Sequence, residues 1–216
     1  MERIFPARLD CRYLLRPGEP GGVLIVALHG FSSNPETMLR LTEMLAGSRH
    51  TIASLEGPYG FFLGAGRPDI GYGWATTQRR DASVRLHHDM VRHTLAEAGR
   101  ELGIPAERRF LLGFSQPVSL NYRFAEAHPG LVRGLIGICG GLPGDWDDGA
   151  PRRIESAVLH IARAGDEIYP PSLTEQFAGR LRLRCDDVEF HQLDGGHRVP
   201  SKGAPLIRHW LDRVLR

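Results

Sequence analysis

Continuous apolar runs that end close to a glycine recur along the chain. They occupy residues 23–28, 110–112, 134–138 and 157–162, with 188–193 as a further candidate strand and 51–54 as a weaker one. Runs of this kind are typical of strands that are buried on both faces of a parallel sheet. Between them lie segments with apolar residues at helical spacing, at 36–46, 83–102, 116–128, 172–183 and 204–215.

This alternation of strands and helices predicts an α/β fold, with a mostly parallel central sheet flanked by helices on both faces. No linker, internal repeat or shift in composition divides the chain. We therefore expect a single domain over residues 1–216. In sheets of this type ligands bind at the carboxyl ends of the strands, so candidate functional residues are sought there.

One connection, residues 55–82, is 28 residues long and shows no convincing period. Its aromatic residues are Tyr59, Phe61, Phe62, Tyr72 and Trp74. A connection of this length inside a compact domain is usually functional or disordered, and the aromatic content argues against disorder. We interpret it as the wall of a substrate pocket, with Phe61, Phe62, Tyr72 and Trp74 as lining residues. The alternative is that these aromatics only pack the connection onto the core.

Composition narrows the classes of partner. The formal net charge of +2 is small and evenly spread, so we expect no nucleic acid partner. Three cysteines without a C-x-x-C spacing argue against a disulfide framework or a cysteine-rich zinc site, and Cys139 is expected to be a small buried apolar residue. No apolar run approaches the length of a membrane span or signal peptide, so we expect a cytoplasmic protein without membrane insertion.

The 26 glycines and 15 prolines exceed the ordinary share but follow no Gly-X-Y period, which excludes a collagen-like chain. The first strand is not followed by Gly-x-Gly-x-x-Gly, and no phosphate-binding Gly-x-x-x-x-Gly-Lys-Ser/Thr occurs. The nucleotide-binding interpretations of an α/β sheet therefore lose their main support.

The sharpest local motif is Leu-Leu-Gly-Phe-Ser-Gln-Pro-Val at residues 111–118, where a buried strand passes through Gly113 into Ser115 and a helix follows. A strand-to-helix turn of this kind places a serine hydroxyl at the edge of the sheet, as a nucleophile elbow does. The motif alone is weak, because glycine and serine are ordinary turn residues.

Two further residues, on loops that follow strands, strengthen the interpretation of this motif as a catalytic serine. A serine needs a base to remove its proton, and that base needs an acid to orient it. His197 and Asp166 fit these roles, and the chain order Ser, Asp, His is that of α/β-hydrolases. The rival acids are Asp145, Asp147, Asp148 and Asp194.

Other histidines have different interpretations. His29 is expected to brace the loop after the first strand, and His87 and His88 are interpreted as a surface pair on a helix. The His87-His-Asp89 sequence lacks the i, i+4 spacing of a helical zinc site, so no metal is expected there.

An oxyanion requires backbone donors opposite the nucleophile. The loop after the first strand, His-Gly-Phe-Ser-Ser-Asn at 29–34, is placed to supply one of them. We predict the N–H groups of Phe31 and Gln116 as the oxyanion hole.

Together these motifs resemble the small carboxylesterase, phospholipase and acyl-protein thioesterase branch of the α/β-hydrolase superfamily. The matching segments are His29-Gly30, 56–58, 71–74, 113–116, 165–167 and Gly196-His197, spread over nearly the whole chain. The resemblance implies a serine hydrolase acting on carboxylic esters, acyl thioesters or lysophospholipids, without a metal, an organic cofactor or a large lid domain. It implies Ser115 as nucleophile, His197 as base and Asp166 as orienting acid. Homodimers are common in the family, although nothing in this sequence marks an interface.

The chain departs from the family at one position. Pro117 stands where the motif ends in glycine, and proline adds a ring and removes an N–H. A proline is tolerated in the first turn of a helix, where N–H groups lack intrahelical partners. If the ring shifts the elbow, the alternative function is a catalytically weak small-molecule binding protein with the same fold.

Overall fold

The computed structural model describes all residues except 2, 6, 67 and 149–150. Its main sheet has seven strands in the order β1-β3-β2-β6-β7-β8-β9, parallel throughout except for β1 at one edge. The strands are β1 (Tyr13–Arg16), β2 (Leu24–Leu28), β3 (Thr51–Leu55), β6 (Arg109–Phe114), β7 (Gly134–Ile138), β8 (Ala157–Arg163) and β9 (Val188–Leu193). The prediction of a mostly parallel sheet is confirmed.

The helices follow the predicted segments closely. They are α1 (Pro35–Ala46), α2 (Arg80–Glu101), α3 (Pro117–Ala127), α4 (Pro171–Thr174), α5 (Phe177–Arg182) and α6 (Ala204–Val214), with short 3-10 helices η1 (Ala106–Arg108), η2 (Gly144–Asp147) and η3 (Ser201–Gly203). The single helix predicted at 172–183 is two short helices joined by a turn at residues 175–176.

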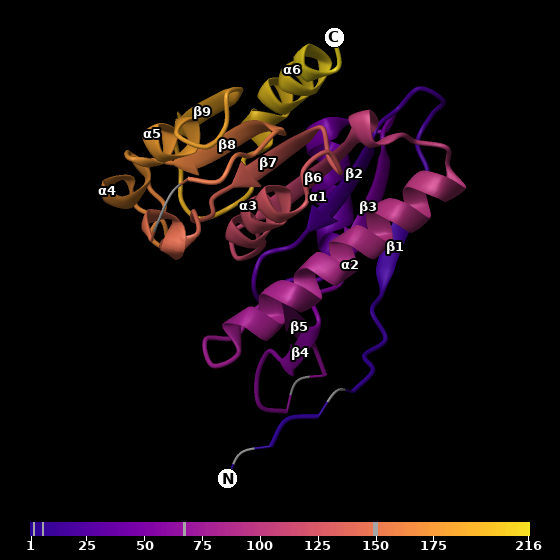
Figure 1. Ribbon diagram of the computed structural model, residues 1–216, viewed down its shortest axis with the longest axis vertical. Helices are drawn as coiled ribbons and strands as arrows, with labels where there is room; N and C mark the ends of the chain where they lie inside the picture. Colours follow the sequence, from indigo (N-terminus) through magenta and orange to yellow (C-terminus); the bar gives the residue numbers. More distant parts are fainter. Residues whose placement is uncertain (2, 6, 67, 149–150) are drawn as a thin grey trace.

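Two apolar layers enclose the sheet. The side chains of β2 alternate between them: Leu24 and Val26 belong to the layer that contains α2, α3 and α5, and Ile25 and Ala27 to the layer that contains α1 and α6. Figure 1 shows these two groups of helices on opposite faces of the sheet. Burial on both faces is the reason that the central strands are continuously apolar in sequence.

The weakly apolar segment at 51–54 is part of β3, a fully buried strand between β1 and β2. Two of its polar side chains form hydrogen bonds with backbone groups of neighbouring segments. The Ser54 hydroxyl donates to the Pro35 carbonyl at 2.9 Å, and Thr51 Oγ1 accepts from the Gly18 N–H at 3.0 Å. Hydrogen bonds of this kind allow polar residues in a buried strand.

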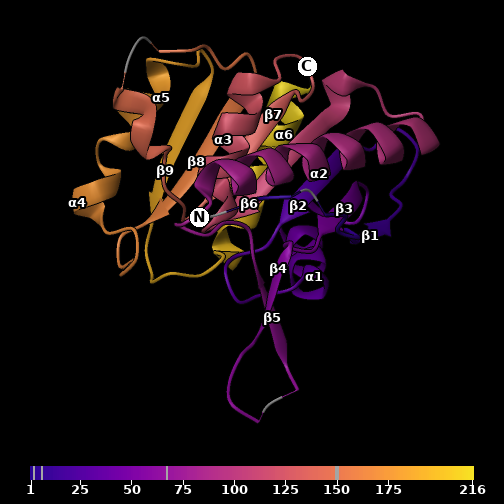
Figure 2. The same cartoon turned by 60° about the horizontal axis from the view of Figure 1, so that its bottom comes forward.

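The long connection at 55–82 contains a hairpin, which the lack of a convincing period in its sequence did not predict. Strands β4 (Tyr59–Phe62) and β5 (Ile70–Gly73) pair antiparallel outside the main sheet. Figure 2 shows the hairpin projecting beyond the carboxyl ends of β2 and β6. Glycines at 60, 71 and 73 interrupt the apolar alternation by which a strand is recognised in sequence.

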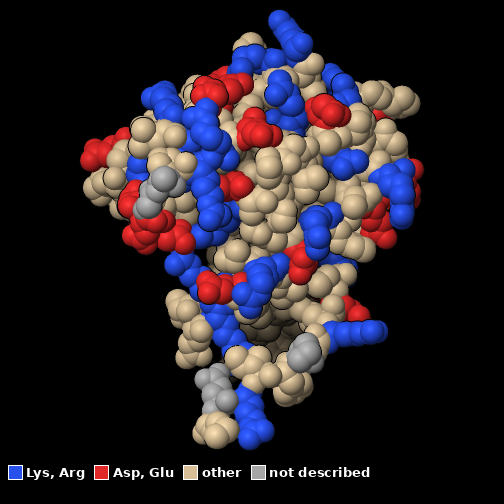
Figure 3. Space-filling model, viewed as in Figure 1, with Lys and Arg blue, Asp and Glu red and all other residues tan. Residues whose placement is uncertain are grey.

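Acidic and basic side chains are interspersed over the face drawn in Figure 3. This distribution agrees with the small formal net charge of +2. Within the described part of the chain, no helix has the length and apolar character needed to cross a membrane.

Candidate active site

Loops from four parallel strands meet at the carboxyl edge of the sheet. Ser115 follows β6, Asp166 follows β8 and His197 follows β9, while the 29–34 loop follows β2. Parallel strands deliver their carboxyl ends to one edge, so residues far apart in sequence become neighbours there.

The turn at Ser115 has the conformation of a nucleophile elbow. Ser115 has a φ of 62°, a left-handed conformation that is strained for serine. Its N–H donates to the Ile138 carbonyl of β7 at 2.9 Å, and α3 begins two residues later. At Gly113 a Cβ would lie 2.8 Å from Asn121 Nδ2, so a larger residue there would displace the Asn121 side chain of α3.

Pro117, the residue that departs from the family motif, is buried at the first position of α3. The N–H that proline lacks would have no intrahelical partner at this position, and the fixed φ of proline suits a helix start. The next N–H, that of Val118, donates to the Ser115 carbonyl at 3.2 Å. In this structure the proline is therefore compatible with the turn.

The three residues predicted as a triad form one hydrogen-bonded chain. His197 Nε2 lies 2.9 Å from Ser115 Oγ. On the other side of the ring, His197 Nδ1 lies 2.9 Å from Asp166 Oδ2 and 3.0 Å from Oδ1. The rings of Phe114 and Tyr169 flank the imidazole, with centroids at 5.1 and 5.9 Å. The arrangement can pass a proton from the serine hydroxyl to the imidazole.

Asp166 is buried and held by backbone donors. The N–H groups of Ile168 and Tyr169 donate to its Oδ1 at 2.9 and 2.8 Å. Burial acts to raise the pKa of this carboxyl, but the Tyr169 N–H, the His197 ring and the Ile168 N–H outweigh it and lower the pKa. The side chain is thus an ionised acceptor facing the imidazole.

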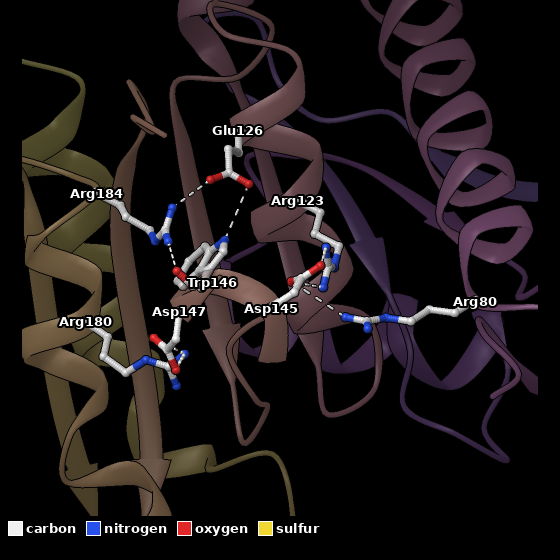
Figure 4. Close-up of polar contacts among 8 residues, drawn as sticks. All are labelled: Arg80, Arg123, Glu126, Asp145, Trp146, Asp147, Arg180 and Arg184. Carbon is white, nitrogen blue, oxygen red and sulfur yellow. Dashed lines mark hydrogen bonds and ion pairs between the residues drawn. The ribbon is translucent and has the colours of Figure 1, made fainter. Parts of the chain in front are cut away.

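Two of the rival acids are engaged elsewhere. Figure 4 shows Asp145 between Arg123 and Arg80, and Asp147 beside Arg180. Both acids belong to η2, which these ion pairs tie to α2, α3 and α5. They lie in a surface network and make no contact with His197.

Of the two N–H groups predicted as oxyanion donors, that of Phe31 belongs to the 29–34 loop and that of Gln116 to the turn that carries Ser115. Within the described residues neither N–H has an acceptor in the protein. Ser32, next to Phe31, has a φ of 66°, and the Ser33 N–H closes the turn onto the Gly30 carbonyl at 3.1 Å.

His29 braces this loop, as the sequence predicted. Its Nδ1–H donates to the Gly30 carbonyl at 2.8 Å and its Nε2 accepts from the Gly57 N–H at 3.0 Å. Burial lowers the pKa of the ring, which keeps it neutral and able to fill both roles.

The interpretation of His87 as a surface residue is wrong. Its ring is fully buried beneath Trp74 and lies 3.1 Å, through Nε2, from Asn121 Oδ1. The mixed polarity of α2 hid this in the sequence, because Trp74 and α3, which cover this ring, come from distant segments of the chain.

The four residues predicted to line a pocket occupy different environments. Phe61, Phe62 and Tyr72 line a cavity of about 330 Å³ on the hairpin, and Phe61 stacks on Phe31 with centroids 4.9 Å apart. Trp74 is different, because it has no exposed surface and its Nε1–H donates to the His29 carbonyl at 2.7 Å. The structure places Trp74 in the core beneath the hairpin.

Sequence reasoning missed the position of Cys139. Its thiol is buried as expected, but its sulfur lies within 4.8 Å of ligand atoms of Asp166 and His197, the group of potential metal ligands found among the described residues. Burial raises the pKa of this thiol to about 12, so it is protonated at neutral pH. The absence of a metal requirement stays a prediction.

No protein-family model matches the chain. Among curated proteins, acyl-protein thioesterase 1 of Schizosaccharomyces pombe is 25% identical over 157 residues, covering 67% of this chain. The match spans 66% of the thioesterase's own length, slightly under two thirds.

Solved structures match over almost the whole chain. The Bacillus cereus carboxylesterase has a TM-score of 0.74 at 14% identity, covering 94% of each chain. Esterase PE8 has a TM-score of 0.75 at 20% identity, covering 95% of this chain and all of that one. A carboxylesterase from Mesorhizobium loti has a TM-score of 0.73 at 22% identity, covering 94% and 95%. The chain therefore has the α/β-hydrolase fold of these carboxylesterases.

Proposed function

We propose that this protein is a serine hydrolase that cleaves carboxylic esters or acyl thioesters. The observation that carries the proposal is the hydrogen-bonded chain from Ser115 through His197 to Asp166 at the carboxyl edge of the sheet. The esterase names of the similar structures and the thioesterase name of the curated relative support the same reaction class.

In the acylation step, Ser115 Oγ attacks the carbonyl carbon of the ester while His197 Nε2 takes the hydroxyl proton. The carbonyl π electrons move to the oxygen, and the N–H groups of Phe31 and Gln116 donate to the resulting oxyanion. When the tetrahedral intermediate collapses, the bond to the leaving oxygen or sulfur breaks. His197 then returns its proton to the leaving group, and an acyl-enzyme remains.

Deacylation repeats these steps with water as the nucleophile. His197 takes a proton from water, the hydroxide attacks the acyl carbon, and the bond to Ser115 Oγ breaks as the serine regains its proton. Asp166 remains ionised in both steps, orients Nδ1–H and stabilises the imidazolium. Its lowered pKa suits this role, because a neutral, protonated carboxyl would lack the negative charge that stabilises the imidazolium.

The hairpin supports an apolar acyl group as part of the substrate. Phe61, Phe62 and Tyr72 line its cavity, and Phe61 stacks on Phe31, the proposed oxyanion donor. An acyl chain that extends from the serine past Phe31 would meet these rings. Apolar contact of this kind favours longer acyl groups over acetyl by a fraction of a kcal/mol to about 1 kcal/mol per methylene.

The test compares the wild-type protein with Ser115→Ala on aryl acetates and butyrates, and follows covalent labelling by a fluorophosphonate with intact-mass spectrometry. We expect the variant to lose nearly all turnover, retaining at most the roughly 10³–10⁴-fold enhancement over water that binding and the oxyanion hole supply. The label should add one phosphonyl group to the wild type and none to the variant.

The alternative function, a catalytically weak binding protein whose elbow is shifted by Pro117, predicts a different result. Wild type and Ser115→Ala would then hydrolyse all of these esters equally slowly, and neither would be labelled. That outcome would contradict the hydrolase proposal.

A further inference from the structure

A short segment of chain next to the hairpin contacts both loops that carry the proposed oxyanion donors. This bridging segment comprises residues 72–75, at the end of β5. Its Tyr72 carbonyl accepts from the Ser32 N–H at 2.9 Å, and the Tyr72 N–H donates to the Ser33 carbonyl at 3.0 Å. The bridging segment is thus bonded to the chain directly after Phe31.

At its other end, the bridging segment is bonded to the side chain of Gln116. The Trp74 N–H donates to Gln116 Oε1 at 2.8 Å, and Gln116 Nε2 donates to the Ala75 carbonyl at 3.3 Å. The carboxamide uses its acceptor and one donor on consecutive residues of one segment. A carboxamide that pairs with the backbone in this way fixes the residue that carries it.

Side-chain packing reinforces the same junction. The Trp74 indole N–H donates to the His29 carbonyl at 2.7 Å, at the start of the loop that holds Phe31. A Cβ on Gly73 would lie 3.2 Å from the Phe31 ring and 3.5 Å from Gln116 Oε1. The 29–34 loop, the bridging segment and the nucleophile elbow therefore meet at Gly73, which has no side chain.

We propose that the bridging segment sets the distance between the N–H groups of Phe31 and Gln116, and that the Gln116 carboxamide is the positioning residue that attaches it to the elbow. This inference rests on the proposed hydrolase function. Oxyanion donors act only when both lie about 3 Å from the developing charge, and a misplacement of about 1 Å can cost roughly 10²-fold in rate. Gln116 would thus contribute twice, through its N–H and through its side chain.

The kinetic test uses two substitutions at this position. Gln116→Glu retains the shape and the acceptor but replaces the donor to the Ala75 carbonyl, whereas Gln116→Leu removes both hydrogen bonds. Neither change removes the backbone N–H of residue 116. We expect kcat for a short aryl ester to fall by roughly 10- to 100-fold with KM changed by less than about threefold, since the loss is confined to the transition state.

The matched control is Gln176→Glu, the same substitution at an exposed glutamine at the start of α5. It should leave kcat and KM unchanged. Inhibition by a boronic acid that forms a tetrahedral adduct with Ser115 is a second measurement. In the Gln116 variants its inhibition constant should rise in parallel with the loss of kcat.

Hydrogen exchange tests the position of the loop without relying on turnover. Amide exchange of Ser32 and Ser33, whose N–H groups are hydrogen-bonded in this loop, should become faster in Gln116→Leu, while exchange in β6 and β8 and the unfolding midpoint of Gln116→Glu stay near wild-type values. A general loss of packing would instead raise exchange throughout the sheet.

An unchanged kcat, a rise in KM alone, or unchanged exchange at Ser32 and Ser33 would each overturn the inference. If the wild-type protein hydrolyses no ester, the proposed function fails, and the exchange measurement still decides whether Gln116 holds the two loops together.

Discussion

The triad and the hairpin lie at the same edge of the sheet but differ in how they are held. Asp166 is buried among backbone donors, and Ser115 is fixed between β7 and α3. On the hairpin, Phe62 is 71% exposed and Ile70 is 45% exposed, while Trp74 beneath them is fully buried. Proton transfer requires groups fixed to within tenths of an ångström, whereas contact with an apolar chain requires accessible surface.

The largest effect is expected at the triad. Asp166→Asn should lower kcat/KM for aryl esters by about 10⁴-fold, because the amide stabilises the wrong tautomer of His197 and cannot stabilise its cation. Asp147→Asn is the matched control, since that rival acid pairs with Arg180 and its side chain is 73% exposed. Equal losses in the two variants, measured by initial rates, would show that Asp166 has no special role.

Trp74→Ala should give the largest loss of stability in the hairpin region, about 3–5 kcal/mol in the free energy of unfolding by urea titration. The cause is a cavity beneath the hairpin together with the lost bond to the His29 carbonyl. Phe62→Ala should change the same quantity by less than about 0.5 kcal/mol. If the two substitutions cost the same, the distinction between a buried base and an exposed tip is wrong.

Stability should also fall in mild acid. Burial lowers the pKa of His87 to about 3 and that of His160 to about 3, whereas the unfolded chain has the ordinary value near 6.5. The unfolded state therefore binds more protons below pH 6.5, and the contribution of each neutral ring is lost as pH falls towards 3. The expected slope approaches about 1.4 kcal/mol per pH unit for each histidine.

Urea titrations at pH 7, 6 and 5 measure the slope of the free energy of unfolding against pH. His87→Gln should reduce this slope by the contribution of one histidine. A free energy of unfolding that stays constant or rises from pH 7 to pH 5 would contradict the expectation.

The smallest effect is expected at the hairpin tip. Phe62→Ala should lower the ratio of kcat/KM for octanoyl over acetyl aryl esters by about fivefold, equivalent to about 1 kcal/mol of apolar contact. Leu183→Ala, at an exposed leucine just after α5, serves as the control. An unchanged ratio would mean that the acyl chain does not reach the hairpin.

The sequence alone predicted much of this architecture. The apolar runs gave β2, β6, β7 and β8 within a residue or two, because strands buried on both faces carry that composition regardless of their neighbours. The motif around Ser115, together with the loops at Asp166 and His197, predicted residues that the structure brings into one hydrogen-bonded chain. The roles of these three residues stay a prediction until the variants are measured.

Other features depended on contacts between distant segments. The edge strand β1 was not predicted, and the hairpin was hidden because its glycines interrupt the apolar alternation. Trp74 was assigned to a pocket wall, but burial beneath the hairpin depends on His29 and α2 and has no local signature.

The sequence by itself determined which segments become strands and helices and which residue types are available for chemistry at their ends, because periodicity and turn residues act locally. Only the tertiary structure decided which of those residues meet. It placed the buried thiol of Cys139 beside Asp166, and it joined the Gln116 carboxamide to the bridging segment. Distances of about 3 Å between residues tens of positions apart are set by the packing of whole elements, which no local pattern encodes.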